Sequence, residues 1–299
     1  MSGAARPDMG PAGRAAPARG RTLLGVALRL GRVSNLPTVW TNAALGAVLS
    51  GAPSVGAVLL GTVALTLLYL GGMWLNDAFD AEIDAAERST RPIPAGEIGR
   101  GAVFAGGWAL LGAGVAAAAA GGALWTALAL AGAIVLYDWC HKRTVLAPVV
   151  MGASRALAVL LGAALAGGIT GAAIVAGLGL LAYVAGLTYA ARGEARDRLG
   201  AAWPLAVLAV PLVVALWAAW GSVLGLLCWA VLAAAMAASL RWLARRGPGD
   251  VPAAVSLLIA GISLHDAAWI GGAGAPALAL ASAGAFGLTL LAQRRVPGT

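Results

Sequence analysis

The stretch from Val55 to Asp84 reads VGAVLLGTVALTLLYLGGMWLNDAFDAEID and decides the fold. Its first 22 residues carry no charged side chain, whereas its last eight carry four acids. An uncharged run of this length matches the roughly 20 residues that a helix needs to cross the hydrocarbon core of a bilayer. We therefore expect a membrane-spanning helix that ends in a group of acids at one membrane surface.

Long uncharged segments recur along the whole chain. Of its 299 residues, 61% are hydrophobic and only 11% are charged, against about 25% charged in an ordinary soluble domain. This composition excludes a soluble enzyme, and it is too apolar for a disordered or collagen-like chain. The sequence predicts an all-α fold, a polytopic membrane helical bundle of nine to ten transmembrane helices. Ten apolar segments carry this prediction: 33–50, 55–76, 102–120, 123–138, 145–166, 170–190, 201–219, 222–240, 252–270 and 275–292.

Two further features set the domain organisation and the orientation. Residues 1–22 are rich in Pro, Ala, Gly and Arg, so we expect a disordered tail before a single transmembrane domain at 23–299. Of the 20 Lys and Arg residues, all except Arg155 fall on one side of the predicted bundle. The positive-inside rule places that side in the cytoplasm of a multi-pass protein of the cell membrane, and with ten spans both termini lie there. The formal net charge of +8 is then a topology signal beside membrane lipids, and no nucleic-acid partner is expected.

The acids that follow the second apolar segment share a helical face. No Gly or Pro lies between Asn76 and Asp84, so we expect the helix to continue through them. At about 100° per residue, Asp77, Asp80 and Asp84 then project from one side, and Glu82 points elsewhere. Like charges at these spacings repel, so a cation should compensate them. Hard oxygen ligands of this kind suit Mg²⁺, which binds one or two carboxylates together with water and substrate phosphate.

These residues carry a family resemblance. Asn76-Asp77-x-x-Asp80-x-x-x-Asp84 resembles the first aspartate-rich motif of the UbiA superfamily of intramembrane prenyltransferases. Three weaker matches follow the family order along almost the whole chain: Arg29-Leu-Gly-Arg32-Val-Ser-Asn35-Leu-Pro37, Arg91-Pro92-Ile-Pro94-Ala-Gly96, and Tyr137-x-x-x-x-Lys142-Arg143-x-x-x-x-Pro148. Within the superfamily, residues 34–41 look closest to a divergent EboC-like branch.

The resemblance implies a cytosol-facing cavity in the bundle and an enzyme that uses Mg²⁺. It would transfer a prenyl group from a prenyl diphosphate to a lipid-soluble, hydrophobic acceptor, aromatic or otherwise. The metal-binding and catalytic residues implied are Asp77, Asp80, Asp84, Glu194 and Asp197. Those implied for the diphosphate are Asn76, Arg91, Lys142, Arg143 and Arg198. Those implied for the acceptor or the cavity wall are Arg29, Arg32, Asn35, Tyr137 and Arg155.

One stretch departs from the family pattern. Where the family carries a second pair of aspartates, the chain reads RGEARDRLG at residues 192–200, so Glu194 and Asp197 lie among three arginines. This change keeps two alternatives open: a non-catalytic transporter or lipid-binding protein on the same scaffold, and a membrane terpene cyclase. A CDP-alcohol phosphotransferase is disfavoured because the Asp-Gly and Ala-Arg parts of its signature are missing upstream of Asp80.

Two ionisable sites lie inside predicted spans. Arg155 is about two turns from the cytoplasmic loop, and a buried arginine in a membrane segment usually faces a cavity or a partner, so we expect it to line the cavity. His265 and Asp266 lie near the opposite face, where we expect a self-satisfied pair or a contact that locks the bundle.

Overall fold

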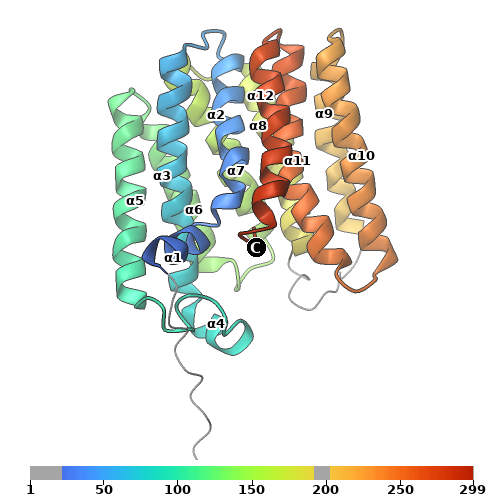
Figure 1. The fold of residues 1–299 in the computed structure, drawn as a ribbon. Coiled ribbons are helices and arrows are strands. Elements are labelled where there is room, and N and C mark those ends of the chain that lie inside the picture. Colours follow the sequence, from blue (N-terminus) through green and yellow to red (C-terminus); the bar gives the residue numbers. More distant parts are fainter. Residues whose placement is uncertain (1–21, 192–202, 299) are drawn as a thin grey trace, which may run out of the picture.

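A computed structural model describes residues 22–191 and 203–298, and throughout these it contains helices and no strand (Figure 1). The predicted tail at 1–22 lies almost entirely outside the described residues. The helices are α1 (Leu23–Leu30), η1 (Val33–Asn35), α2 (Leu36–Leu49), α3 (Val55–Phe79), α4 (Ala81–Glu87), α5 (Arg100–Ala120), α6 (Leu124–Cys140), α7 (Ala147–Ala166), α8 (Gly171–Ala191), η3 (Trp203–Leu208), α9 (Ala209–Ala219), α10 (Val223–Arg245), α11 (Asp250–Gly272) and α12 (Pro276–Gln293). Each of the ten predicted apolar segments therefore contains a helix, and the predicted all-α fold is confirmed.

The lengths of these helices bear on the number of membrane spans. Seven of the described helices, α3, α5, α7, α8, α10, α11 and α12, are long and apolar enough to cross a bilayer. The other three apolar segments are shorter, with 14 residues in α2, 17 in α6 and 11 in α9. The total of nine to ten spans stays a prediction, because it depends on these three.

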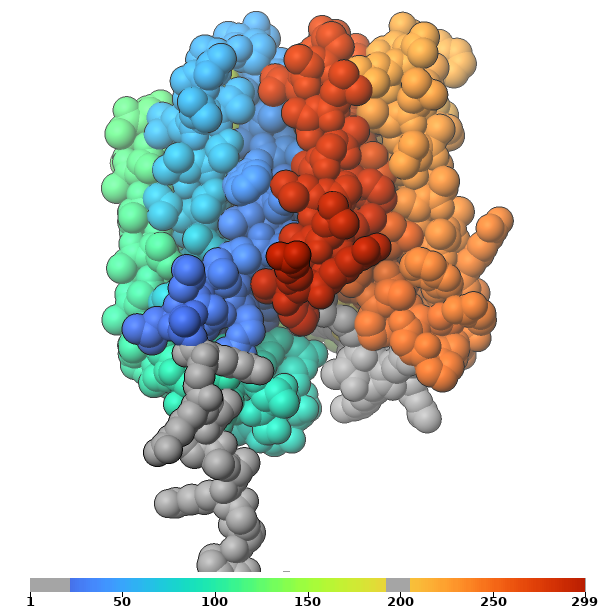
Figure 2. Space-filling model, viewed as in Figure 1, coloured from blue at the N-terminus to red at the C-terminus, as the bar shows by residue number. Residues whose placement is uncertain are grey.

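The two ends of the bundle differ as the charge pattern predicts. Short turns join the long helices at one end, and Gly122 and Gly274 adopt the left-handed backbone that such tight turns require (φ 82° and 79°). At the other end lie α1, α4 and the C-terminal residues (Figure 1). Figure 2 shows the C-terminal end of α12 beside α1 at this end.

Helix α2 packs closely against α7 near the centre of the bundle. A Cβ atom at Gly46 would lie 2.1 Å from the carbonyl oxygen of Val159, and one at Gly162 would lie 2.6 Å from that of Ala43. Small residues allow this backbone-to-backbone approach, which is a common way for membrane helices to associate. The contact fixes α2 and α7, and both helices carry residues of the candidate site.

Buried polar contacts also tie α11 to α2. Asp266 accepts hydrogen bonds from Thr41 Oγ1 and Asn42 Nδ2, both at 2.7 Å, and His265 Nδ1 lies 3.1 Å from its other oxygen. Both expected arrangements are present, because His265 pairs with Asp266 and Asp266 also joins α11 to α2.

The helix prediction through the acidic stretch is wrong in one respect. Helix α3 ends at Phe79, Asp80 has φ −82° and ψ −2°, and α4 begins at Ala81. The amide of Asp80 still bonds to Asn76 O and that of Asp84 to Asp80 O, so the chain bends without losing these bonds. No Gly or Pro marks this bend. The predicted division of the side chains is nevertheless correct, because Asp77, Asp80 and Asp84 are buried and Glu82 is exposed.

Candidate active site in the membrane cavity

A cavity of about 710 Å³ opens between α2, α3, α6, α7, α8 and α11. Apolar side chains such as Leu65, Leu68, Ile134 and Ile262 form much of its wall. Its charged lining residues belong mostly to the loop end of the bundle: Arg32, Asp80, Glu87, Arg88, Arg91, Asp138, His141, Lys142 and Arg143. The arrangement offers an apolar chamber with a charged mouth, which suits a ligand with a polar head and a hydrocarbon tail.

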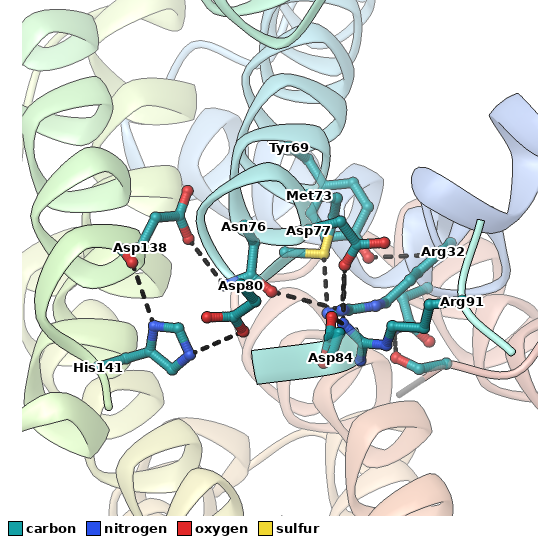
Figure 3. A network of polar contacts seen from close by, with 12 residues as sticks. Arg32, Tyr69, Met73, Asn76, Asp77, Asp80, Asp84, Arg91, Asp138 and His141 are labelled. Atoms are coloured by element: carbon teal, nitrogen blue, oxygen red, sulfur yellow. Dashed lines mark hydrogen bonds and ion pairs between the residues drawn. The ribbon is translucent and has the colours of Figure 1, made fainter. Parts of the chain in front are cut away.

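The buried acids at this mouth lie between two sets of basic side chains (Figure 3). On one side, Arg32 Nη2 contacts Asp77 Oδ1 at 2.9 Å. On the other side, His141 Nε2 lies 3.1 Å from Asp80 Oδ2, and Lys142 Nζ lies 3.9 Å from the same oxygen. The mutual repulsion of the carboxylates is thus compensated by cationic side chains drawn from other parts of the chain.

Arg91 joins two of the acids. Its Nη1 nitrogen lies 2.9 Å from Asp77 Oδ1 and also 2.9 Å from Asp84 Oδ2. Burial raises the pKa of the Asp84 carboxyl, with Asp80 and Asp77 adding to the rise and Arg91 opposing it. Burial likewise lowers the pKa of Arg91, and the positive charge of Arg32 lowers it further. Both directions follow from the burial of several charged groups beside one another.

Asp80 has a different balance. Burial alone would raise the pKa of its carboxyl, but the hydrogen bond and charge of His141, with the charges of Lys142 and Arg91, hold that pKa below its ordinary value. His141 is well placed for this, because its ring stacks on Tyr137 with centroids 4.9 Å apart. Its Nδ1 faces the carbonyl oxygens of Tyr137 and Asp138 at 3.2 and 3.3 Å. Asp80 is therefore held as a carboxylate.

Arg32 reaches the acids from a strained backbone position. It has φ 41° and ψ 49°, the left-handed conformation that costs a residue with a side chain about 1–2 kcal/mol. From there its Nη2 also contacts Asn76 Oδ1 at 3.4 Å, and its carbonyl oxygen accepts a bond from Tyr69 at 3.3 Å. The strain is stored where the chain turns from α1 into the first long helical segment.

The donor set fits a divalent cation in chemistry, with one rearrangement. Among the described residues, no three His, Cys, Asp or Glu side chains are gathered closely enough to hold a metal ion. However, Asp77 and Asp84 already direct one oxygen each at a single point that Arg91 Nη1 occupies. Asp138 adds a buried carboxylate oxygen, Oδ2, that has no hydrogen-bond partner among the described residues, while its Oδ1 accepts from Asn76 at 3.1 Å. Mg²⁺ needs only one or two carboxylates, with water and phosphate completing its shell.

Comparison with known proteins decides the family. The sequence model of the UbiA prenyltransferase family matches residues 35–269, which is well over half of the chain. The chain belongs to the UbiA prenyltransferase family. Together with its long apolar helices, membership of the UbiA family makes it a multi-pass membrane protein.

Curated relatives match part of the chain. It is 38% identical over 120 residues to digeranylgeranylglyceryl phosphate synthase of Methanopyrus kandleri, covering 39% of this chain and 44% of that protein. It is 35% identical over 109 residues to protoheme IX farnesyltransferase of Geobacter sulfurreducens, covering 35% and 40%. The chain thus spans less than half the length of these two UbiA relatives in the matched regions.

Solved structures of UbiA homologues share the fold over most of their length. The apo structure of a homologue from Aeropyrum pernix superposes with a TM-score of 0.65 at 19% identity, covering 80% of this chain and 96% of that one. A homologue from Archaeoglobus fulgidus bound to GPP and Mg²⁺ gives a TM-score of 0.52 at 14% identity, covering 82% and 99%. At these identities the likeness establishes the UbiA fold alone.

The predicted site residues of the UbiA motifs are only partly brought together. The main cavity is lined by Arg32, Asn35, Asn76, Asp80, Arg91, Tyr137, Lys142, Arg143 and Arg155. Asp77 and Arg29 line a smaller neighbouring cavity of about 420 Å³, and Arg29 pairs with Glu97. Asp84 lines neither cavity, since Arg91 covers it. Glu194, Asp197 and Arg198 lie outside the described residues.

Several residues at the site carry no predicted role. Asp138, His141 and Arg88 line the main cavity. Arg88 follows Asp84 by one helical turn, and that spacing could have drawn attention to it. Asn35 is also engaged in an unforeseen way, because its Nδ2 donates to the carbonyl oxygen of Gly298 at 2.8 Å, which brings the C-terminal segment to the cavity.

Proposed function

We propose that this chain transfers a prenyl group from a prenyl diphosphate to a lipid-soluble acceptor, and that the reaction depends on Mg²⁺. The observation that carries the proposal is the convergence of Asp77 and Asp84 on one cation position beside an apolar cavity with a charged mouth. Membership of the UbiA family supports it. The UbiA homologue from Archaeoglobus fulgidus solved with GPP and Mg²⁺ supports the same pairing of ligand and ion.

The proposal assigns the acids to the metal. Asp77, Asp80 and Asp84 would hold Mg²⁺, with Arg91 moving aside to the diphosphate. When bound, the ion supplies positive charge to the departing diphosphate oxygens. Glu194 and Asp197 are proposed as further metal ligands from the sequence motif. The carboxylates are paired with cations in the structure, so their shared position already favours positive charge.

The basic residues at the mouth are assigned to the diphosphate. Lys142 and Arg143 are exposed and line the cavity, and Arg88 lines both cavities. With Asn76, Arg91 and Arg198, they would bind the leaving group as its bond to the prenyl carbon breaks and the electron pair departs with the diphosphate. Fixed cations in a water-poor site stabilise such developing charge effectively.

The apolar wall is assigned to the prenyl chain, and Arg32, Asn35, Tyr137 and Arg155 to the acceptor side. The acceptor supplies the electron pair for the new bond to the allylic carbon and then loses a proton. Arg29 is assigned only to the outer rim, because it faces the smaller cavity. The positive-inside rule supports a mouth that faces the cytosol, with both termini on that side.

The test is binding and turnover of geranyl, farnesyl and geranylgeranyl diphosphates by the purified protein, with Mg²⁺ and with EDTA. We expect binding that requires Mg²⁺ and release of diphosphate when an acceptor is supplied. Asp80→Ala should weaken Mg²⁺-dependent binding by more than about tenfold, the least effect seen for residues that only support a metal ligand. Glu82→Ala, an exposed acid on the same segment, is the matched control and should change it little.

Three results would contradict the proposal. The first is binding of prenyl diphosphate that EDTA leaves unchanged. The second is an equal loss of Mg²⁺-dependent binding in Asp80→Ala and Glu82→Ala. The third is an absence of turnover with every acceptor offered. The last result, with binding intact, would favour the non-catalytic alternative. A product formed without any acceptor would instead indicate a terpene cyclase.

A further inference from the structure

A second polar group lies deeper in the bundle than the acids. Arg155 is eight residues beyond Ala147, the first residue of α7, which is about 12 Å along the helix axis. Its side chain lines the main cavity, and its guanidinium carbon lies 5.9 Å from the centre of the Tyr69 ring. Tyr69 precedes Asp77 on α3 by eight residues, again about 12 Å. Arg155 is therefore about two turns from the acids at the mouth.

Arg155 is connected to a carboxylate through an amide. Its Nη1 donates to Asn42 Oδ1 at 3.0 Å, and Asn42 Nδ2 donates to Asp266 Oδ2 at 2.7 Å. Asn42 and Asp266 are both fully buried. Among residues 22–191 and 203–298, no ion pair joins Arg155 directly to an acid. Asn42 thus relays between a cation and an anion on two different helices, α7 and α11.

This relay leaves hydrogen-bonding capacity on the cavity side. An unpaired charge inside a membrane protein is costly, and the bonds through Asn42 place the Asp266 carboxylate near the Arg155 guanidinium. A guanidinium has five N–H donors, and Asn42 takes only one of them. A direct carboxylate partner would typically take two in a bidentate pair. The relay therefore compensates the charge while keeping donors available to a ligand.

The surroundings decide which ligand would use these donors. Leu68 adjoins Tyr69 on α3, Ala158 lies one turn beyond Arg155 on α7, and both line the cavity. A prenyl chain gains nothing from a guanidinium, and the diphosphate has its own cations two turns away at the mouth. An anionic oxygen on the second substrate would form a charge-assisted hydrogen bond, which is strong where water is scarce.

We propose that Arg155 determines acceptor specificity by binding an anionic oxygen, carboxylate or phosphate, on the acceptor. Asn42 and Asp266 are positioning residues that hold and balance the guanidinium. This inference rests on the proposed function, because it requires an acceptor in the cavity. It is separate from the metal and diphosphate site, which involves other residues.

The experiment compares acceptor probes that differ by one anionic group. The pairs are 4-hydroxybenzoate against its methyl ester, and geranylgeranylglyceryl phosphate against geranylgeranylglycerol. Binding to the full-length protein in detergent is measured by calorimetry with Mg²⁺ and a slowly reacting thiolo analogue of geranyl diphosphate. We expect the charged member of one pair to bind at least about tenfold more tightly than its neutral partner. The pair that shows this preference identifies carboxylate or phosphate as the recognised group.

Variants assign the preference to Arg155. In Arg155→Gln the charged and neutral probes should bind within about twofold of each other, and Asn42→Ala should reduce the preference by a smaller factor. Arg155→Lys keeps the charge and should keep part of the preference, which maintains the test if the Gln variant does not fold. Ser263→Ala is the matched control, since Ser263 is a fully buried residue on α11 outside the relay.

The results that would overturn this inference differ from those that would contradict the proposed function. Wild-type protein that binds both members of each pair equally, or binds none of the four probes, would overturn the inference. So would a charge preference that survives in Arg155→Gln. Loss of Mg²⁺-dependent binding of geranyl diphosphate itself would instead count against the proposed function, and it is measured without any acceptor.

Discussion

Asp77 and Asp84 each place a carboxylate oxygen 2.9 Å from the same nitrogen atom, Nη1 of Arg91. Six residues, among them Asp80 at the bend, lie between them in the chain, yet they share one cationic partner. A guanidinium nitrogen between two carboxylates is an arrangement that a divalent cation could take over, provided that the arginine withdraws. Stability and ligand binding should therefore be coupled through Arg91.

Replacing Arg91 tests this coupling. Arg91→Gln leaves two buried carboxylates without their shared partner, so we expect the free energy of unfolding without metal to fall by about 3 kcal/mol, the lower end for breaking a buried pair. Mg²⁺ should restore more stability to the variant than it adds to the wild type. Unfolding in detergent with and without Mg²⁺ measures both effects. Glu82→Gln removes an ion pair whose acid is 84% exposed and should cost less than about 1 kcal/mol. An equal effect of Mg²⁺ on both proteins would contradict the coupling.

The pKa of Asp80 predicts a dependence on pH. A carboxyl whose pKa is lowered by folding stabilises the folded state above its unfolded pKa of about 3.9, and this stabilisation is lost as pH falls through the folded pKa. His141→Phe keeps a ring to stack on Tyr137 but removes the bond that lowers the pKa. The variant should be less stable than the wild type at neutral pH by about 1.5 kcal/mol or more.

That difference should begin to shrink as pH falls below the ordinary carboxyl pKa of about 3.9, and it should be lost once pH passes below the lowered pKa of Asp80 in the wild type. Unfolding temperatures measured from neutral pH down to this range provide the test. Lys142→Gln is the control, because Lys142 is partly exposed and lies 3.9 Å from Asp80, so its effect should be smaller. A stability difference that persists unchanged in acid would mean that His141 acts through packing rather than through charge.

Two substitutions of Arg32 separate the cost of its left-handed backbone from the effect of losing its charge. Arg32→Ala and Arg32→Gly both remove the ion pair with Asp77, but glycine adopts this conformation without the cost of a Cβ. We expect the Gly variant to be more stable than the Ala variant by about 1 kcal/mol. Since Arg32 is assigned to the acceptor side, both variants should bind an acceptor more weakly than the wild type, by a similar factor.

Arg246 provides the comparison, with φ 57° at the end of α10, away from both cavities. Its Gly and Ala variants should show the same difference in stability with unchanged ligand binding. If Arg32→Gly were no more stable than Arg32→Ala while the Arg246 pair differed, the backbone strain assigned to Arg32 would be refuted.

Because α2 packs closely on α7, glycine-to-alanine substitutions inside and outside this contact should change stability in different directions. Gly46→Ala forces a Cβ atom against the backbone of α7, so we expect a loss of about 1–3 kcal/mol and a weakened cavity wall. Gly112→Ala on α5 meets open space and should leave stability unchanged or raise it by up to about 1 kcal/mol. Unfolding of the two variants under identical conditions gives the comparison. A neutral Gly46→Ala would mean that the two helices are free to separate.

The sequence predicted those features that depend on local composition. Apolar length located the ten helical segments, and the spacing of Asp77, Asp80 and Asp84 against Glu82 separated the buried acids from the exposed one. The bend at Asp80 was not predicted, because no Gly or Pro marks it in the chain. The acid pairs with cations from α6 and its loop, and such partners depend on how distant helices pack.

The relay through Asn42 was unpredictable for the same reason. Asn42, Arg155 and Asp266 belong to α2, α7 and α11, and nothing in any one of these apolar segments names the other two residues as partners. Arg155 could be placed at the cavity by the rule that membrane arginines face partners or cavities. Its partner could not be named, because periodicity gives the face of a helix but not its neighbour.

The hydrogen bond from Asn35 to the carbonyl oxygen of Gly298 has a practical consequence for experiments. The segment around Gly298 lies at the cavity, so an affinity tag fused shortly after it would begin beside the cavity-lining residues Asn35 and Arg32. Such a tag could obstruct the mouth or pull Gly298 away from Asn35. Assays on a C-terminally tagged preparation should therefore be repeated after the tag is cleaved, and a change in ligand affinity on cleavage would reveal the contact directly.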